Sequence, residues 1–350
     1  MGRRGMVGRA RTMGESVGAL RRGLAARRSE ADLAGQTALI TGGSRGLGLL
    51  LARQFADSGC RVAICARDDA ELAQAKADLR ERGADVYSVV CDVGDSDQVE
   101  ACIAAVTQHY GAIDILVNNA GIIQSGPLQA MTIADFQAAM QSDFWGTLLP
   151  TLAVLPQMRQ RRAGRIVNIT SIGGKVSVPH LLPYSCAKFA AVGLSEGLRA
   201  EVARDGITVT TIVPGLLRTG SLLNADVKGQ RDKEFTLFAL AESLPFISMD
   251  AEQAAREIVT ATRRGEAERV LSLPAQVMVR AHGLFPGSTA TALGLVGRLL
   301  PSGAGADRLA ERGGAVYRRL RSPLLDTLIG MSLSAARRFN EGDGRGEPPR

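Results

Sequence analysis

Short apolar runs alternate with helix-length stretches from residue 36 to about residue 215, and this alternation strongly limits what the chain can fold into. The runs are rich in Val and Ile and are not interrupted by alternating polar residues, as expected for strands covered on both faces. They are Thr37–Ile40, Arg61–Cys65, Val86–Val90, Ile113–Val117, Arg165–Ile169 and Thr208–Val213. Helical patterns separate them, so we predict an α/β fold with a parallel sheet and right-handed crossovers.

The remainder of this region extends the pattern. Arg269–Leu273 is a candidate last strand, which gives a Rossmann-type doubly wound parallel sheet of about seven strands. Residues 216–248 have mixed polarity and are interpreted as a mobile helical flap. Pro150 and Pro156 lie within the helical segment 132–160. Because proline disrupts the hydrogen bonding of a helix interior, we expect them to bend or divide this helix.

Composition divides the chain into four segments. They are a basic, flexible N-terminal tail at 1–33, a catalytic domain at 34–275, a helical C-terminal extension at 276–340 and a disordered tail at 341–350. The extension holds an apolar stretch, Gly283–Gly297, which is interrupted by Pro286 and is too short for a transmembrane helix. It has three candidate roles: contact with a membrane surface, a cover for a substrate cleft, or an interface. We favour the last two.

A final amphipathic helix is predicted to open at Ser322 and Pro323. Leu325, Leu328, Ile329 and Leu333 fall along one stripe of it.

Charge is concentrated at the two ends of the chain. The net charge is +7, and residues 1–30 and 263–350 each carry +6, which leaves an acidic middle. Such ends attract anionic lipids or nucleic acids, but without a motif we interpret them as solvated, with Met13 as an alternative start. An aromatic content of 4% disfavours stacking on bases. We expect no nucleic-acid partner, and a cytoplasmic protein with at most weak association with a membrane surface.

The cysteines indicate a reducing compartment. They are Cys60, Cys65, Cys91, Cys102 and Cys186. Their number is odd, most lie in apolar runs, and neither they nor the three scattered histidines have the spacing of a metal site. We therefore expect buried, reduced thiols and no bound metal.

A glycine-rich turn, TGGSRGLG, spans Thr41–Gly48 between the first predicted strand and a helix. Gly42 allows the tight turn, Gly46 lets the backbone approach a pyrophosphate, and Gly48 permits close packing of helix on sheet. The exposed N–H groups and the positive end of the helix then receive phosphates. A purely structural turn is the alternative, but the strand–turn–helix context favours a dinucleotide site.

The end of the second strand bears on the choice of cofactor. It carries Ala66 and Arg67, and Arg45 lies in the first turn. A small neutral residue with two guanidinium groups favours a 2′-phosphate, because arginine binds phosphate bidentately. Asp68 is a competing signal for a ribose-binding carboxylate, but with Glu71 three residues later it is better explained as a helix capping box. We predict that NADP(H) is preferred over NAD(H).

Tyr184 and Lys188 are four residues apart in PYSCAK, and Ser171 lies thirteen residues upstream of the tyrosine. If this segment is helical, the phenol and the ammonium share a face. A phenol titrates near pH 10, and a nearby cation lowers that pKa by roughly 1–3 units, closer to the value that suits a general acid–base. Together with a nucleotide turn, these residues indicate hydride transfer at an alcohol or ketone.

The assembled motifs resemble the short-chain dehydrogenase/reductase family over roughly residues 34–275. The motifs, in order, are TGGSRGLG at 41–48, CDV at 91–93, NNAG at 118–121, Ser171 within NITS, YSCAK at 184–188 and PG at 214–215. The resemblance implies a Tyr184 acid–base, a Lys188 that lowers its pKa and holds the nicotinamide ribose, and a Ser171 that orients the substrate oxygen. It also implies that Asp92 accepts from the adenine amino group.

The residues expected at the cofactor are Gly42, Ser44, Arg45, Gly46, Leu47, Gly48, Arg67, Asp92, Val93, Asn119, Ala120, Gly121, Tyr184, Lys188, Pro214, Gly215 and Thr219. The residues expected at the substrate are Ser171, Ile172, His180 and Tyr184.

One catalytic position departs from the family pattern. Asp143 stands where the family usually has an asparagine whose main-chain carbonyl holds a water connected to the lysine. Any residue supplies a carbonyl, so the relay can survive, but a carboxylate near Lys188 could instead stabilise the ammonium or misplace the water. We favour a tolerated substitution, and expect Asp143→Asn to leave activity equal or higher.

The sequence thus predicts an oxidoreductase that transfers hydride between NADP(H) and the carbonyl or secondary alcohol of a small, hydrophobic substrate such as a lipid, steroid or acyl-chain intermediate. A non-catalytic NADP-binding scaffold or redox sensor is the alternative, and the intact Ser171, Tyr184 and Lys188 set disfavours it. By analogy with the family, the helices near 132–160 and 184–204 should pair between subunits of a homodimer or homotetramer.

Overall fold

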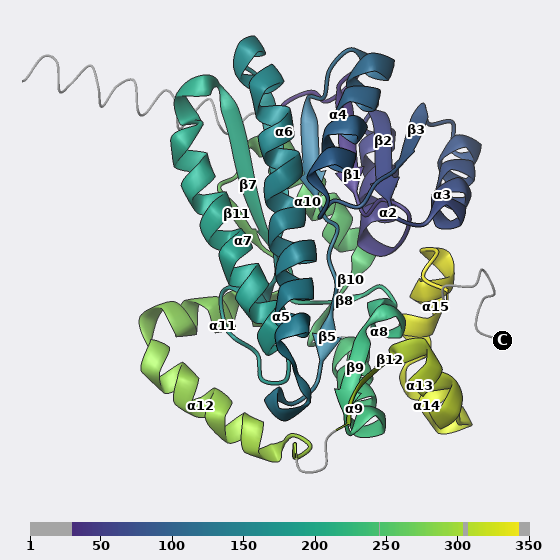
Figure 1. Cartoon of the computed structure of the whole chain (residues 1–350), viewed down its shortest axis with the longest axis vertical. Helices are drawn as coiled ribbons and strands as arrows, with labels where there is room; N and C mark the ends of the chain where they lie inside the picture. Colours follow the sequence, from purple (N-terminus) through teal and green to yellow (C-terminus); the bar gives the residue numbers. More distant parts are fainter. Residues whose placement is uncertain (1–29, 245, 304–306, 343–350) are drawn as a thin grey trace, which may run out of the picture.

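A computed structural model describes residues 30–244, 246–303 and 307–342 of the chain (Figure 1). Most of the expected N-terminal tail lies outside these residues. Its last residues do not behave as a free tail, because the Leu33 side chain is fully buried and the Ala31 N–H donates to the Arg263 carbonyl at 3.1 Å. The expected disorder of 343–350 also lies outside the described residues.

Seven parallel strands form the central sheet, as predicted. They are β1 (Thr37–Thr41), β2 (Arg61–Ala66), β3 (Val86–Val90), β4 (Ile115–Asn118), β6 (Gly164–Ile169), β7 (Ile207–Val213) and β11 (Glu268–Val270). Their order across the sheet is β11-β7-β6-β4-β1-β2-β3. The order reverses direction between β1 and β4, and this reversal opens a crevice at the carboxyl ends of the strands.

Helices cover both faces of the sheet. They are α2 (Gly46–Asp57), α3 (Asp69–Glu81), α4 (Ser96–Tyr110), α6 (Gly146–Arg161), α7 (Leu182–Glu201) and α10 (Ala251–Arg264). Apolar residues of α2, α3 and α10 form one buried core with the sheet, and those of α4 and α6 form a second core on the other face. Strands buried on both faces explain why each apolar run in the sequence is continuous.

The segment 132–160 is divided, but not by its prolines. Helix α5 (Ile133–Ala139) passes into a π-helical turn, Met140–Trp145, and α6 then continues through both Pro150 and Pro156. The expectation that the prolines divide the helix is wrong. The interruption lies before the prolines, in the π-helical turn, which contacts α7.

The segment after β7 is more varied than the predicted helical flap. It contains β8 (Leu216–Arg218), α8 (Ser221–Asn224), β9 (Asp226–Gly229), α9 (Arg231–Ser243) and β10 (Ser248–Asp250). Strand β8 pairs with β10, while β9 pairs with both β5 (Gln124–Ser125) and β12 (Asp307–Arg312). These small sheets connect the flap to the body of the protein.

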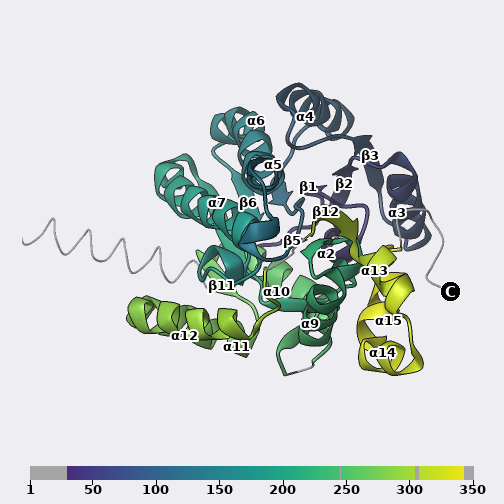
Figure 2. The ribbon, with the colours of Figure 1, turned by 60° about the horizontal axis from the view of Figure 1, so that its bottom comes forward.

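The C-terminal extension has two parts that lie on different sides of the flap in both views of the ribbon (Figures 1 and 2). The first is a helical arm, α11 (Leu273–Leu284) and α12 (Pro286–Leu299). The second is α13 (Gly313–Leu320), α14 (Pro323–Leu328) and α15 (Gly330–Arg338). The predicted final helix is therefore two helices, and Leu325, Ile329 and Leu333 bury their side chains in a small core against α8 and α9. Among the described residues, no helix is long and apolar enough to cross a membrane.

Candidate active site

A cavity of about 1050 Å³ opens at the carboxyl ends of the strands and extends from the glycine-rich turn to the start of α7. Almost every residue expected at the cofactor or the substrate lines it. They are Gly42, Ser44, Arg45, Leu47, Gly48, Arg67, Asp92, Val93, Asn119, Ala120, Gly121, Asp143, Ser171, Ile172, Tyr184, Lys188, Pro214, Gly215 and Thr219. Gly46 and His180 do not line it, for reasons given below.

The glycine-rich turn has the geometry of a cradle for phosphates. Gly42 has a φ of +62°, which disfavours any side chain, and a Cβ on Gly48 would lie 2.0 Å from the Gly42 carbonyl oxygen. Helix α2 begins at Gly46 and has no acidic residue in its first turn. In this structure the Gly46 N–H donates to the Phe339 carbonyl at 2.7 Å. A helix N-terminus without an acidic residue in its first turn nevertheless suits a pyrophosphate.

The end of β2 differs from expectation in one respect. Arg67 is exposed at the cavity wall, but Arg45 donates from Nη1 to Glu71 Oε1 at 2.7 Å, and Ser44 Oγ donates to the other oxygen of that carboxylate at 3.0 Å. Asp68 caps α3 by accepting from the Glu71 N–H at 2.9 Å. Only half of the predicted capping box forms, because the Glu71 side chain binds the glycine-rich turn instead.

Two neighbouring asparagines at the end of β4 have different tasks. Asn118 is buried, and its amide donates to Thr151 Oγ1 at 2.9 Å and to Asn168 Oδ1 at 2.8 Å. Asn119 lines the cavity and donates to the main-chain carbonyls of Thr41 and Gly42 at 3.0 and 3.2 Å. Asn118 thus ties β4 to β6 and α6, whereas Asn119 holds the glycine-rich turn against the strand end.

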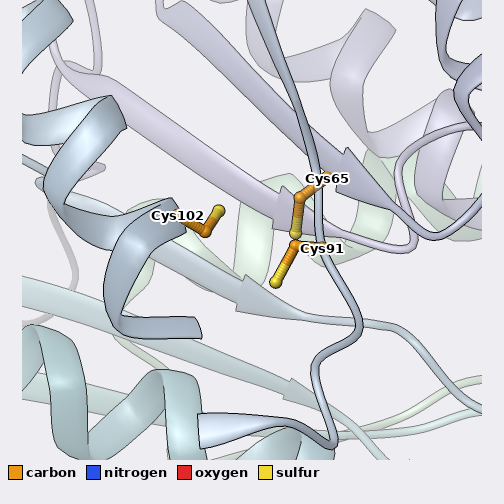
Figure 3. A group of neighbouring side chains, drawn as sticks. All are labelled: Cys65, Cys91 and Cys102. Carbon is orange, nitrogen blue, oxygen red and sulfur yellow. The ribbon is translucent and has the colours of Figure 1, made fainter. Parts of the chain in front are cut away.

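Three cysteines from separate elements converge beside the sheet, and one of them, Cys91, lines the cavity (Figure 3). Cys65 lies in β2, Cys91 follows β3, and Cys102 lies on α4. All three are buried, and their sulfur atoms lie within 4.8 Å of one another. Sequence spacing gave no sign of this group, because the three residues meet only through the sheet. They belong to the apolar core under α4, as expected for buried thiols, and Cys60 is buried as well. Cys186 is exposed on α7, so the expectation of a buried thiol is wrong for this residue.

Tyr184, Lys188 and Ser171 meet at the other end of the cavity. Tyr184 and Lys188 lie one helical turn apart at the start of α7, and Lys188 Nζ lies 5.6 Å from the centre of the Tyr184 ring. The Lys188 ammonium donates to the Ile169 carbonyl at 3.2 Å. Ser171 follows β6, and its Oγ accepts from the Gly173 N–H at 3.0 Å. The Ser171 hydroxyl also bonds to the Tyr184 phenol, and this contact lowers the pKa of Tyr184.

Asp143 forms an ion pair with Lys188. Its side chain is fully buried in the π-helical turn, and Oδ1 lies 3.1 Å from Lys188 Nζ. Gly121 makes room for this carboxylate, since a Cβ there would lie 2.3 Å from Oδ1. The main-chain carbonyl of Asp143 accepts from Thr147 Oγ1 at 2.9 Å. The sequence left open whether the Asp143 carboxylate is merely tolerated, stabilises the Lys188 ammonium or misplaces a water. The observed ion pair matches the second of these alternatives.

The pKa of Tyr184 reflects opposing influences. Burial is the largest and raises the pKa above its usual value, Lys188 and the Ser171 hydroxyl lower it, and the charge of Asp143 raises it. Lys188 acts in the expected direction, but the net shift of the Tyr184 pKa is upward because burial outweighs it. Burial lowers the pKa of Lys188, and Asp143 and Tyr184 outweigh it, so the ammonium keeps its proton.

His180 is not among the residues that line the cavity. It adopts a φ of +65°, and its Nδ1 lies 2.8 Å from Oε1 of Glu234 on α9. The prediction that it contacts substrate does not match this placement. Its task in the described residues is to fasten the loop before α7 to the flap.

Two buried glutamates at the cavity were not predicted. Glu242 lies on α9, and burial raises its pKa to about 7, although the N–H groups of Gly220 and Thr219 oppose this. Glu341 follows α15, and burial, aided by Glu242, raises its pKa to about 8. Both belong to parts of the chain far from the motifs, and residue 341 was expected to be disordered. No local sequence signal could have placed them.

Comparisons with known proteins identify the family of the chain. Residues 36–228 match the model of the short chain dehydrogenase family. A Streptomyces violaceoruber protein named as ketoacyl reductase 1 of the granaticin polyketide synthase is 45% identical over 186 residues, which cover 52% of this chain and 68% of the relative. The Mycobacterium tuberculosis protein SadH, named as an oxidoreductase, is 34% identical over 246 residues, covering 70% of this chain and 88% of the relative.

A solved structure shows the same fold. The actinorhodin polyketide ketoreductase F189W with NADPH is 30% identical, with a TM-score of 0.60, and the match covers 69% of this chain and 97% of that chain. The fold and site define a nicotinamide-dependent oxidoreductase with a doubly wound sheet. The chain belongs to the short-chain dehydrogenase family and acts on CH–OH or carbonyl groups.

Proposed function

We propose that this protein uses NADPH to reduce the carbonyl group of a small, apolar ketone to a secondary alcohol. The observation that carries the proposal is the meeting of Ser171, Tyr184 and Lys188 at one end of a cavity whose other end is a glycine-rich phosphate turn. The phosphate-binding turn and the proton donor Tyr184 lie apart in one cavity. A dinucleotide needs this arrangement, because its phosphates and its nicotinamide ring are at different places in the molecule.

The chain's own residues bind, orient and move one proton. A nicotinamide cofactor, when bound, supplies the hydride or accepts it in the reverse direction. Ser171 orients the substrate oxygen through its hydroxyl group. Tyr184 donates its proton to that oxygen as negative charge develops there, and accepts it back during oxidation. Lys188 lowers the energy of the resulting phenolate through its charge, and Asp143 holds the ammonium in place.

Arg67 supports a preference for NADPH. Its guanidinium is exposed at the cavity wall next to Ala66, where a 2′-phosphate could accept from it. Arg45 contributes less than its position suggested, since Glu71 neutralises part of its charge. The preference for NADPH over NADH therefore depends mainly on Arg67.

An apolar substrate is supported by the apolar residues of the cavity wall. Val178, Leu181, Phe238, Ile247 and Met278 line the cavity that also holds Tyr184. One similar protein is named as a ketoacyl reductase and another as a polyketide ketoreductase. A ketone attached to an acyl chain is thus the substrate class that we favour.

The test is a panel of aliphatic, cyclic and β-ketoacyl thioester ketones, with NADPH oxidation followed by absorbance. Wild-type protein should oxidise NADPH faster with apolar ketones than with polar ones, and faster with NADPH than with NADH. Ser171→Ala is the matched variant, since it keeps the cofactor end intact. If wild type and Ser171→Ala consume NADPH equally slowly with every ketone, the proposed reduction is wrong.

We also propose a homo-oligomer. Trp145, Leu152 and Phe189 are exposed large apolar side chains on the π-helical turn, α6 and α7, the helices expected to pair between subunits. Light scattering coupled to size-exclusion chromatography tests this assembly, and a monomer at micromolar concentration would contradict it.

A further inference from the structure

The helical arm α11–α12 exposes several large apolar side chains. Leu273, Leu284 and Leu299 are 71%, 73% and 85% exposed, and Phe285 is 63% exposed. None of the residues of α12 is buried. The views agree that the arm stands away from the sheet (Figures 1 and 2). The expectation that this stretch covers the substrate cleft does not hold for α12. Contiguous apolar surface of this kind marks a site of interaction.

The positive charge of the arm favours an anionic partner. From Arg269 to residue 303 the described chain has no aspartate or glutamate, whereas Arg280 and Arg298 are exposed on the two helices. An apolar face flanked by arginines is typical of a helix that lies in the interface of an anionic membrane. Symmetric pairing of two identical arms would bring like charges together, which disfavours a second copy as the partner.

The position of the arm links it to the cavity. Ala275 and Met278 of α11 line the cavity that holds Tyr184. Ile247, on the loop before β10, also lines it, and its neighbour Phe246 is 89% exposed. An apolar arm and an exposed phenylalanine therefore stand beside the cavity wall. A bilayer in contact with both would lie next to the route by which an apolar substrate enters.

We propose that α11–α12 docks the protein on the surface of an anionic lipid bilayer, with Leu284, Phe285 and Leu299 in the acyl boundary and Arg280 and Arg298 at the headgroups. Docking does not depend on the identity of the substrate, and can be measured without turnover. The N-terminal basic tail is a separate source of charge, so the test must vary the arm itself.

The experiment is co-sedimentation of the full chain with vesicles of phosphatidylcholine alone or of phosphatidylcholine with phosphatidylglycerol. We expect binding to the anionic vesicles, and at least tenfold weaker binding for Leu284→Ser/Phe285→Ser. Leu309→Ser is the matched control, because Leu309 is 72% exposed on β12, outside the arm. No binding by wild type, or equal binding by the arm variant, would overturn the proposal. Loss of a dimer rather than of vesicle binding in that variant would show that a second copy covers the arm.

A second inference comes from an independent observation, the position of the chain's own end in the glycine-rich turn. The Gly46 N–H donates to the Phe339 carbonyl at 2.7 Å, and Asn340 Nδ2 donates to the Ser44 carbonyl at 2.9 Å. The Glu341 side chain is 5% exposed, and its Oε1 lies 1.9 Å from where a Cβ of Gly46 would stand. The Glu341 carboxylate thus fills the space that the absent side chain leaves for a pyrophosphate.

Glu341 is poorly accommodated there. Its Oε2 is buried without a hydrogen-bond partner among the described residues, and buried Glu242 lies near enough to raise its pKa. An unpaired buried carboxylate oxygen is unfavourable. If the pyrophosphate of a dinucleotide replaced the Glu341 carboxylate, the N-terminus of α2 would bind an anion without leaving a buried oxygen unpaired. This explains why Gly46 is absent from the cavity lining.

We infer that Phe339–Glu341 is an autoinhibitory segment, which must leave the glycine-rich turn before the cofactor's pyrophosphate binds. The inference rests on the proposed cofactor site. The test measures the NADPH dissociation constant by calorimetry, without substrate. Glu341→Ala should bind NADPH at least threefold more tightly, whereas Asp326→Asn, a carboxylate of α14 away from the turn, should bind as wild type does. Equal or weaker binding by Glu341→Ala overturns the inference, while absence of NADPH binding in every form would instead overturn the proposed cofactor site.

Discussion

Replacing Asp143 by asparagine should lower the pKa of Tyr184 and move the pH dependence of catalysis to lower pH. Lys188 Nζ lies 3.1 Å from Asp143 Oδ1 and 5.6 Å from the centre of the Tyr184 ring, so the carboxylate oxygen lies within about 9 Å of that ring. With an effective dielectric constant of about 20, two unit charges about 9 Å apart interact by about 2 kcal/mol. One pKa unit corresponds to about 1.4 kcal/mol. Removal of the charge should lower the Tyr184 pKa by about one unit or more.

The assay is kcat/KM for NADPH-dependent ketone reduction across the pH range in which the phenol titrates. Reduction needs the protonated phenol, so activity falls as pH rises through the Tyr184 pKa. In Asp143→Asn this descending limb should lie about one unit lower. For alcohol oxidation, which needs the phenolate, the ascending limb should move in the same direction. Below both limbs, the variant's reduction rate should equal or exceed that of wild type.

Asp135→Asn is the matched control. Asp135 is another buried carboxylate with a lysine partner, since Lys228 Nζ lies 2.8 Å from its Oδ1, and it does not line the cavity. This variant should leave the pH limb unchanged. A limb that stays in place or moves to higher pH in Asp143→Asn would refute the electrostatic reasoning.

Three further predictions follow from the geometry. Arg67→Glu should lower kcat/KM for NADPH at least tenfold more than for NADH, and equal losses in steady-state assays with both cofactors would refute the 2′-phosphate contact. Gly48→Ala should abolish measurable NADPH binding in calorimetry, because its Cβ would meet the Gly42 carbonyl; unchanged affinity would show that the turn can open. Burial alone would raise the pKa of Asp135, but its contacts with Lys228 and Thr132 outweigh this and hold the pKa below its usual value. Asp135→Asn should therefore reduce the free energy of unfolding by about 1–3 kcal/mol near neutral pH. That difference should shrink as pH falls through the lowered pKa, and a difference independent of pH in urea titrations would contradict the pairing.

The parallel sheet could be predicted because its signal is local. Each strand is a continuous apolar run, and the helices between them fix a right-handed crossover, so the sequence determines the elements and their sense. Most of the cavity residues could be predicted because their motifs resemble those of a known family. The fold explains why they meet, since the carboxyl ends of parallel strands lie at one edge of the sheet. Ser171 and Pro214 reach the cavity simply because each follows a strand.

Contacts between distant segments could not be predicted. Glu341 reaches Gly46 across almost the whole chain, and nothing near either residue indicates the other. The partner of Arg45 was missed because Glu71 had an equally good local role as a cap. His180 was misplaced because its positive φ and its contact with Glu234 depend on how the flap folds back. Local sequence thus determines the residues at the strand ends, whereas the segments that pack over them are determined by contacts between distant parts of the chain.

Turnover and cofactor affinity of Tyr184→Phe, measured on the same sample, test the central claim most directly. The phenol oxygen carries the proton and contributes little to cofactor binding, so we predict a loss of turnover of roughly 10²–10⁴-fold with an NADPH dissociation constant within about threefold of wild type. Retained turnover in this variant would contradict the account, because the proton would then reach the substrate from another group.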